Sequence, residues 1–308
     1  MRLVFMVTGE ISEETFGAAL ASDHQVVGLV TQPDRPVGRK QVLTPPRVKE
    51  MALAARVPVI QPEKVSQEQA LRQIREWQPE VIVVMAYGQI LPQSLIEIPS
   101  RAIINLHASL LPKYRGASCL QAAIRNGDRE TGWSVIHVVR KLDAGNVILR
   151  KPLPIREGET AGELHDRLAA TGPAALREAL DLLSEGEVPG ETQDEDAQTY
   201  APKLGRSDGK MDWSRPAEEL ERLVRAYHPW PGTSGMLDGK RLKIFPPVSV
   251  GKGTGIPGTF LGIVGQSLEI ACGSGSLRIH EVQLEGSRKM TGAELARGHD
   301  AALEKGLG

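Results

Sequence analysis

The sequence predicts an α/β domain followed by a small all-β barrel, and three observations support this division. Over the first 190 residues, short apolar runs alternate with segments of helical periodicity, which is the rhythm of an α/β sheet. Residues 191–206 are polar and include a proline and a glycine, so we expect a linker there. From residue 207 onward, strand-like runs are separated by glycine-rich turns, a spacing typical of small barrels. We therefore predict domains over 1–190 and 207–308.

The first strand, helix and second strand form one α/β unit. Residues 3–7 are a short apolar run followed by Thr8 and Gly9, and residues 26–30 form the next such run. Between them, Ser12 is placed to cap a helix that continues to about residue 22. The turn after the first strand lacks the Gly-x-Gly-x-x-Gly pattern that a dinucleotide pyrophosphate needs, so we do not expect a nicotinamide or flavin dinucleotide.

Residues 31–46 form a long loop with four prolines and the basic residues Arg35, Arg39 and Lys40. Loops of this length in compact domains are usually functional or disordered. One interpretation is a solvated, mobile surface excursion. The other is a basic finger that becomes ordered on an anionic partner.

A central strand and the turn after it indicate a place where a ligand can approach. Val81–Met85 is a continuous apolar and mostly β-branched run, which predicts a strand buried on both faces. Tyr87 and Gly88 follow it, and a glycine there allows the backbone to come close to a ligand. Three elements precede this strand, namely helices over 48–55 and 67–77 and a short strand over 57–60.

The next strand carries the side chains best suited to chemistry. Residues 102–104 are apolar, and they lead through Asn105 and His107 into a loop rich in serine, proline and glycine that ends at Gly116. Because strand side chains alternate, Asn105 and His107 point to the same side of the pleat. An amide and an imidazole aimed at one point can hold and protonate an oxygen. The alternative is a loop histidine that only hydrogen-bonds its neighbours.

A second polar group follows the next expected strand. Residues 133–139 predict that strand, and the loop over 140–145 contains Asp143 and Gly145. Asp143 is therefore a second candidate functional residue just past a strand end, although an aspartate there also suits a plain turn. The remaining elements of this domain are a helix over Cys119–Asn126, a strand over 147–152 and a helix over 161–183.

The C-terminal part contains a helix and several short strands. The helix begins near Pro216 and ends at about Tyr227, before a Pro-Trp-Pro-Gly breaker at 229–232. Barrels of this size include oligonucleotide-binding barrels, but small barrels also occur as inert caps. The expected elements are strands over 242–245, 258–264, 268–271 and 277–282 and a helix over 291–297.

Composition limits the class of protein. The chain of 308 residues is 41% hydrophobic and 24% charged with a net charge of −1, so a nucleic-acid partner would need a local basic patch. Cys119 and Cys272 are far apart, which indicates neither a disulfide framework nor a zinc site and fits a reducing cytoplasm. No secretory signal and no apolar run of eighteen residues is visible, so we expect neither export nor a membrane span.

Several motifs resemble those of the 10-formyltetrahydrofolate-dependent formyltransferases. The resemblance rests on Asn-Leu-His-Ala-Ser-Leu-Leu-Pro at 105–112, Leu-Asp-Ala-Gly at 142–145 and Pro-Trp-Pro-Gly at 229–232. Within that superfamily, the branch that formylates methionyl-tRNA is the most similar. Its motifs match Gln-Pro-Asp-Arg-Pro at 32–36, Gln-Pro-Glu-Lys at 61–64, Ala-Tyr-Gly-Gln-Ile-Leu-Pro at 86–92 and Tyr-Ala-Pro-Lys-Leu at 200–204.

The resemblance implies a Rossmann-like formyltransferase domain and a C-terminal barrel of the oligonucleotide-binding kind. It implies transfer of the formyl group of 10-formyltetrahydrofolate to the methionine of initiator methionyl-tRNA for translation initiation, by a cytoplasmic monomer that uses no metal. The implied catalytic residues are Asn105, His107 and Asp143. The implied folate-binding residues are Ser109, Leu110, Leu111, Pro112, Tyr87, Gly88, Gln89 and Ile90, and the implied tRNA-binding residues are Arg35, Arg39 and Lys40.

The chemistry of formyl transfer fits these groups. The reaction passes through a tetrahedral intermediate whose oxygen gains charge, and the attacking amine must lose a proton. Asn105 and His107 can stabilise that oxygen, while Asp143 can orient the imidazole and accept the proton. The formyl donor is already activated, so Ser109 and Cys119 are not expected to act as covalent nucleophiles.

Two alternatives remain open from the sequence. An amino-sugar nucleotide N-formyltransferase would share the donor and the three catalytic residues, and the basic pair Arg140 and Lys141 is reminiscent of that group. A non-catalytic RNA-binding or folate-binding module would keep the fold without turnover, but the intact Asn, His and Asp set argues against it. The basic loop around Arg39 and Lys40 favours tRNA over a small sugar nucleotide.

Overall fold

The computed structural model describes residues 1–38, 41–303 and 306–308, and these fall into two compact units. Arg39 and Lys40 therefore lie outside the described residues. Unit 1 comprises Met1–Gly116, Thr131–Leu153 and His165–Tyr200. Unit 2 comprises Ala117–Glu130, Pro154–Leu164 and Ala201–Gly308. Two short segments of the predicted first domain, 117–130 and 154–164, therefore belong to unit 2. The polar segment 191–200 belongs to unit 1.

Unit 1 is built on a seven-stranded sheet of order β5-β2-β1-β6-β7-β8-β9. The pairs β2–β5, β1–β2, β1–β6 and β6–β7 are parallel, whereas β8 runs antiparallel to β7. The strand order reverses beside β1, as in doubly wound α/β folds, so the predicted fold class is confirmed. The strands are β1 (Arg2–Val7), β2 (Gln25–Val30), β5 (Val59–Ile60), β6 (Val81–Met85), β7 (Ala102–His107), β8 (Glu130–His137) and β9 (Val147–Pro154).

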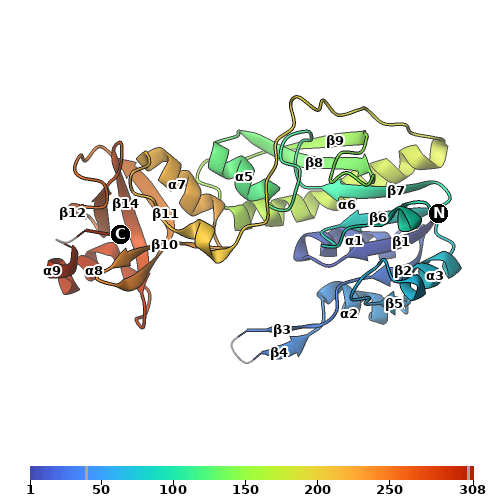
Figure 1. Cartoon of the computed structure of the whole chain (residues 1–308), viewed down its shortest axis with the longest axis horizontal. Coiled ribbons are helices and arrows are strands. Elements are labelled where there is room, and N and C mark those ends of the chain that lie inside the picture. The colour runs from blue at the N-terminus through green and yellow to red at the C-terminus, as the bar shows by residue number, and fades with distance from the viewer. Residues whose placement is uncertain (39–40, 304–305) are drawn as a thin grey trace. The chain divides into compact units, whose positions relative to one another are not determined.

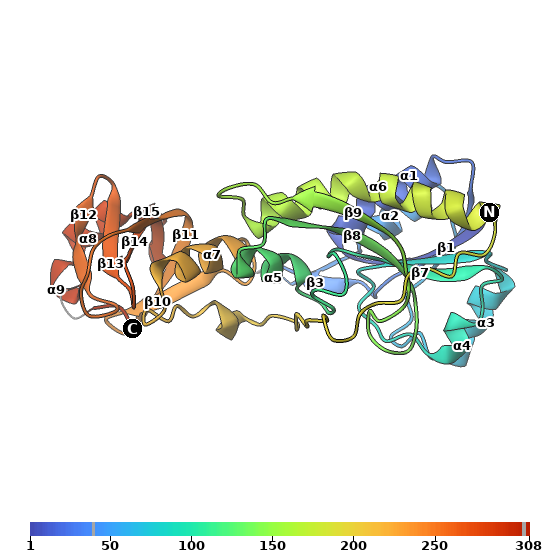
Figure 2. The same cartoon turned by 90° about the horizontal axis from the view of Figure 1, so that it is seen from above.

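Helices cover both faces of this sheet because its strands are apolar on both sides. Val4 and Met6 of β1 pack in one cluster with Ile74, whereas the intervening Phe5 meets Phe16 edge-on at 5.1 Å between ring centroids. Figure 2 shows α1 and α6 over one face and α3 and α4 over the other. The helices of this part are η1 (Glu10–Ser12), α1 (Glu13–Leu20), α2 (Arg47–Ala54), α3 (Glu68–Glu76), α4 (Gln93–Ile96) and α6 (Ala161–Glu185).

Two local expectations for unit 1 were wrong. The Ser12 side chain does not cap α1; its hydroxyl donates to Gly9 O at 2.6 Å, which satisfies it inside the preceding turn. Residues 31–46 are not simply a loop, because they contain the hairpin strands β3 (Arg35–Val37) and β4 (Val42–Thr44). Figure 1 shows this hairpin extending from the sheet. Lys49 Nζ bonds to both Asp34 carboxylate oxygens at 2.9 and 2.8 Å, which ties down the residue that precedes the hairpin.

Unit 2 contains an antiparallel sheet of order β10-β11-β14-β13-β12, with β15 paired to β14. The C-terminal residues bridge its open side, because Gly308 exchanges two backbone hydrogen bonds with Met236 of β10 and Leu307 N donates to Gly258 O. The predicted C-terminal domain of mostly antiparallel strands is thus confirmed, while β10 and β15 were not predicted. Its elements are α5 (Cys119–Asn126), η2 (Arg206–Gly209), α7 (Ala217–Ala226), β10 (Thr233–Leu237), β11 (Lys240–Gly251), β12 (Phe260–Val264), β13 (Ser267–Ala271), β14 (Ser276–Leu284), β15 (Met290–Thr291), α8 (Gly292–Gly298) and α9 (Asp300–Leu303).

Three further properties of the described residues bear on function. No helix among them is both long enough and apolar enough to cross a membrane. No group of three or more histidine, cysteine, aspartate or glutamate side chains among them is placed to hold a metal ion. Cys119 and Cys272 are both buried free thiols, and burial raises the pKa of Cys272 to about 11.

Candidate active site

The end of β7 places Asn105 and His107 on one face of the strand. Alternation puts their side chains on the same side as Ile103, which packs in the core cluster beneath them. His107 is buried and Asn105 is half-buried. The strand therefore presents an amide and an imidazole toward one region, as the sequence predicts.

The hydrogen bond of His107 fixes which ring nitrogen carries a hydrogen. Nε2 of His107 lies 2.8 Å from the carbonyl oxygen of Tyr114. A carbonyl oxygen can only accept, so Nε2 is the donor and Nδ1 is the nitrogen that can take up or release a proton. Nδ1 faces Oδ2 of Asp143 at 3.7 Å.

Asp143 completes the group, because its carboxylate reaches both residues of β7. Nδ2 of Asn105 lies 3.4 Å from Oδ1 of Asp143. The backbone N–H of Gly116 donates to Oδ2 of Asp143 at 2.8 Å. The side chains of His107 and Asp143 are only 7% and 11% exposed, so a charge that develops here is poorly screened by water. The structure thus brings together the three residues that the sequence singled out for catalysis.

The loop that carries Asp143 returns along β7 to reach this point. Because β8 is antiparallel to β7, the loop begins beside Ile103, whose carbonyl accepts a hydrogen bond from Val138 N at 3.0 Å. Gly145 lets the loop close against the end of β8, since a Cβ at this position would lie 1.7 Å from His137 O. Asp143 itself has a φ of +48°, a left-handed conformation that is uncommon for residues other than glycine.

A strap over residues 191–200 bonds to both loops of the site, and sequence reasoning missed its role. Arg115 is 2% exposed. Its Nη2 donates to Gln193 Oε1 at 2.9 Å and to Glu195 Oε1 at 2.8 Å, and its Nη1 donates to Gln198 Oε1 at 2.6 Å. Lys141 also bonds to Glu195. The sequence shows only that Arg115 lies inside the 105–116 motif. Its burial, which the fold reveals, is what requires partners for the guanidinium elsewhere in the chain.

The ion pairs of the strap change the electrostatics beside the site. The hydrogen bonds from Arg115 and Lys141 lower the pKa of Glu195 to about 2. Because Glu195 engages Lys141, one of the two cations of the Arg140 and Lys141 pair is occupied within the protein. This pair therefore offers a weaker argument for a sugar-nucleotide acceptor than the sequence alone indicated.

The predicted folate-binding residues of the 105–116 loop have two different environments. Ser109 is fully buried, and its hydroxyl donates to Lys113 O at 2.7 Å, so this side chain shapes the loop. Leu111 is buried as well. Leu110 and Pro112 are half-buried and keep apolar surface that a ligand can contact.

The second predicted folate segment, Tyr87 to Ile90, combines rigid and open positions. Tyr87 is buried, its hydroxyl has no hydrogen-bond partner among the described residues, and burial raises its pKa. Gly88 has a φ of +83°, which suits glycine. Gln89 accepts from Val65 N at 2.8 Å and donates to Pro62 O. Ile90 is 90% exposed. Gln89 thus holds the loop, while Ile90 presents an apolar surface.

Of the predicted tRNA-binding residues, only Arg35 falls among the described residues. It lies on β3 with a side chain that is 64% exposed, and Nη2 of Arg35 is 3.9 Å from Oε2 of Glu63. Such an exposed pair leaves the guanidinium available to another anion.

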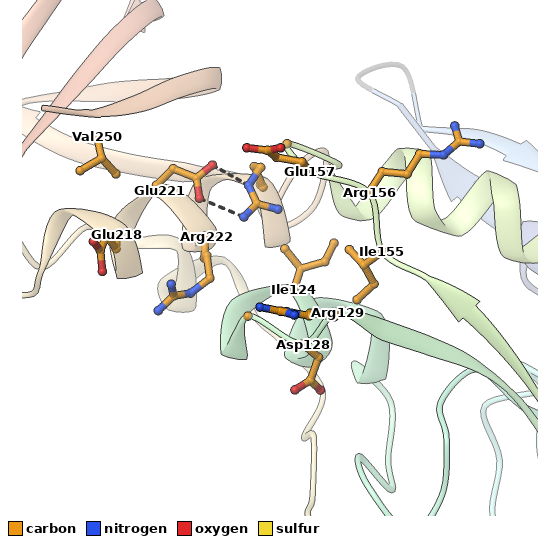
Figure 3. Close-up of a pocket in the computed structure, with 13 residues that line it drawn as sticks. Ile124, Asp128, Arg129, Ile155, Arg156, Glu157, Glu218, Glu221, Arg222 and Val250 are labelled. Carbon is orange, nitrogen blue, oxygen red and sulfur yellow. Dashed lines mark hydrogen bonds and ion pairs between the residues drawn. The ribbon is translucent and has the colours of Figure 1, made fainter.

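A separate cavity of about 430 Å³ lies within unit 2 and contains none of the predicted site residues. Its lining carries as many carboxylates as guanidinium groups, and Figure 3 shows Glu221 bonded to a neighbouring guanidinium. That neighbour is Arg225, whose Nε and Nη2 lie 2.6 and 2.9 Å from the Glu221 carboxylate. This balance of charge selects neither anions nor cations. The charged lining residues are Asp128, Arg129, Arg156, Glu157, Glu218, Glu221, Arg222 and Arg225.

The chain is similar to known proteins over nearly its whole length. Residues 1–180 match the family described as formyl transferase, and residues 203–300 match the formyl transferase C-terminal domain. The methionyl-tRNA formyltransferase of Akkermansia muciniphila is 48% identical over 305 residues, an alignment that covers 97% of each chain.

Two solved structures share the fold at low sequence identity. WlaRD, a sugar 3N-formyl transferase, superposes with a TM-score of 0.67 at 16% identity, covering 94% of this chain and 99% of that one. HypX from Aquifex aeolicus in complex with tetrahydrofolic acid superposes with a TM-score of 0.63 at 18% identity. That match covers 96% of this chain but 46% of HypX. Both likenesses support the fold.

Proposed function

The chain belongs to the methionyl-tRNA formyltransferases, and we propose that Asn105, His107 and Asp143 carry out its reaction. The enzyme transfers the formyl group of 10-formyltetrahydrofolate to the free amino group of methionine on initiator methionyl-tRNA. The observation that supports the residue assignment best is the convergence of the Asn105 amide, the His107 ring and the Asp143 carboxylate from two separate loops.

Asn105 and His107 are suited to stabilise the charge that develops on the formyl oxygen. When the amine nitrogen attacks the formyl carbon, the carbonyl bond opens and its electron pair moves to that oxygen. The Asn105 amide donates a hydrogen bond to the oxygen, and protonated Nδ1 of His107 donates a second. Donors fixed in place before the reaction in a site with little water are worth roughly 3 to 4 kcal/mol each.

Asp143 is suited to take the proton that the attacking amine must lose. The carboxylate accepts this proton directly or through one water, and the carbon–nitrogen bond to the folate then breaks as that folate nitrogen is protonated. As this bond breaks, the electron pair on the oxygen re-forms the carbonyl bond, and the proton lost by the amine ends on the folate nitrogen that leaves. Transfers of this kind contribute about 100-fold to 10,000-fold to the rate.

The substrates are assigned to three regions of the chain. Apolar surface on Leu110 and Ile90 supports folate binding by the 109–112 and 87–90 segments. The exposed guanidinium of Arg35 supports contact of the β3–β4 hairpin, with Arg39 and Lys40, to the tRNA. We propose that residues 1–190 serve catalysis, that 191–206 connect the two parts and that 207–308 bind tRNA through the barrel. We also propose that the enzyme acts as a monomer in the cytoplasm.

A direct acceptor assay tests this function. The purified chain is incubated with 10-formyltetrahydrofolate and, in parallel, with initiator methionyl-tRNA, uncharged initiator tRNA or a nucleotide-linked amino sugar. We expect formylation of the methionyl-tRNA alone. Formylation of the amino sugar with no formyl-methionyl-tRNA would overturn the proposal.

A further inference from the structure

We propose that Gln193 is a positioning residue for formyl transfer, because it holds the turn that carries Asp143. The proposal rests on the proposed function, in which the Asp143 carboxylate acts beside His107. Gln193 lies 50 residues after Asp143 and is 5% exposed. It touches none of the three catalytic side chains in the contacts described above, so it acts through the backbone of the turn.

The Gln193 amide donates to both ends of the turn. Its Nε2 lies 2.8 Å from Asp143 O and 2.8 Å from Gly145 O. The two amide hydrogens thus meet two carbonyl acceptors, which satisfies the donor capacity of the group. One side chain thereby fixes the backbone at Asp143 itself and at Gly145.

Arg115 fixes the orientation of that amide. Its Nε and Nη2 donate to Gln193 Oε1 at 3.1 and 2.9 Å. A flipped amide would set its oxygen against two carbonyls and its NH₂ group against a guanidinium, both of which are repulsive. Glutamine is the fitting side chain at this point because it combines an acceptor for the cation with two donors for the carbonyls.

Gly116 N holds the Asp143 carboxylate at 2.8 Å, but the backbone of the turn depends on Gln193. Among the described contacts, Gln193 is the partner of the carbonyl oxygens of both Asp143 and Gly145. Asp143 has a φ of +48°, and Lys141 and Leu142 before it are exposed. The contacts of its carboxylate to Asn105 and His107 are long, at 3.4 and 3.7 Å. A shift of about 1 Å in a catalytic group can cost on the order of 100-fold in rate, so a backbone anchor at this turn affects turnover directly.

Gln198 offers a matched control on the same strap. Its Oε1 also accepts from Arg115, at 2.6 Å from Nη1. Gln198 is exposed, and its described bond goes to Arg115 and not to the Asp143 turn. A change at Gln198 therefore removes a bond to Arg115 and leaves the anchor of the turn in place.

The experiment compares Gln193→Met with Gln198→Met in the full-length enzyme. We expect Gln193→Met to lower kcat by about 10- to 100-fold while the KM values for 10-formyltetrahydrofolate and methionyl-tRNA change less than about twofold. We expect Gln198→Met to keep kcat within about twofold. Gln193→Glu keeps the acceptor for Arg115 and loses both donors, so it should lower kcat as Gln193→Met does. If the Gln193→Met enzyme melts below the assay temperature, Gln193→Glu takes its place in the comparison.

A double variant separates positioning from general destabilisation. If Gln193 acts through Asp143, then adding Gln193→Met to Asp143→Asn should lower the single-turnover rate by less than about twofold further. An unchanged kcat in both Gln193 variants would overturn the inference. So would an equal loss in the wild-type and Asp143→Asn backgrounds. A full rate in Asp143→Asn alone would instead refute the proposed function, so the two failures are distinguishable.

Discussion

The backbone N–H of Gly116 donates a 2.8 Å hydrogen bond to Oδ2 of Asp143, and this bond joins the two loops of the site. Gly116 ends the loop that follows His107, so the carboxylate is oriented by the histidine's own loop. Oδ2 is also the oxygen that faces Nδ1 of His107 at 3.7 Å. That separation is too long for a hydrogen bond, and a proton on Nδ1 would give the two groups an attractive charge pair. The proposed proton transfers therefore depend on the relative position of these two loops.

The first prediction concerns the two titratable groups of the site. His107→Ala and Asp143→Asn should each lower kcat by about 100-fold or more, as loss of an acid or base group does. Single-turnover rates with methionyl-tRNA measure this loss, and circular dichroism checks the fold. His165→Ala is the control, since His165 lies on α6 and bonds to Asp166. Rates near wild type in either site variant would refute the catalytic assignment.

The second prediction concerns Gly145. An added Cβ would lie 1.7 Å from His137 O, so Gly145→Ala should force the loop away from β8 and destabilise the fold by about 1 to 3 kcal/mol. Its kcat should fall as well, because Asp143 moves with the loop. Gly186→Ala is the matched control, since a Cβ at Gly186 meets no atom within 4 Å. Urea denaturation measures both variants, and equal stabilities would contradict this account of the loop.

The third prediction concerns the pH dependence of stability. Hydrogen bonds from Arg115 and Lys141 lower the pKa of Glu195 to about 2 from 4.5. A lowered pKa stabilises the fold fully above pH 4.5, and this contribution disappears as the pH falls toward 2. The urea midpoint of wild type should therefore exceed that of Glu195→Gln at pH 6, and the difference should shrink steadily between pH 4.5 and 2. A difference in urea midpoint that stays constant over this range would show that the ionised Glu195 carboxylate does not stabilise the fold.

Local sequence patterns predicted the helices and strands whose residues form an uninterrupted apolar run or a regular helical pattern. The uninterrupted run Val81–Met85 and the helix Cys119–Asn126 have the predicted bounds. The strand Thr233–Leu237 was missed because its residues are Thr, Ser, Gly, Met and Leu, which show no apolar run. Its pairing with β11, from Thr233↔Ile244 to Leu237↔Lys240, makes it a strand. Pairing with a neighbouring strand therefore determines the secondary structure of a segment whose own β-propensity is weak.

The same distinction applies to the site. The period of two along β7 predicted that Asn105 and His107 share a face. The path of Asp143 could not be predicted, because nothing local to its loop shows that β8 is antiparallel to β7. The link between Arg115 and Gln193 spans 78 residues, and Gln193 lies in a polar segment whose composition is that of a linker. Only the folded chain shows that this segment holds the turn of Asp143.

The last prediction concerns the β3–β4 hairpin and the choice of tRNA as acceptor. Arg35 on β3 is exposed, and Arg39 and Lys40 follow it in the sequence, so three basic residues fall within positions 35–40. Arg39→Ala with Lys40→Ala should weaken formylation of methionyl-tRNA and flatten its salt dependence, by about 0.9 in the log–log slope for each lost phosphate contact. Binding of the folate donor, measured by calorimetry, should not change.

A charge-matched control makes this last test specific to the hairpin. Arg72→Ala with Arg75→Ala removes the same charge from α3 and should leave the salt slope unaltered, because the proposal places no phosphate contact on α3. A general electrostatic effect, by contrast, would respond to net charge and lower the slope equally in both double variants. Equal losses in the two double variants would mean that tRNA responds to the overall field and not to this hairpin. An unchanged slope in Arg39→Ala with Lys40→Ala would place the phosphate contacts elsewhere, and the barrel of unit 2 would then have to supply them.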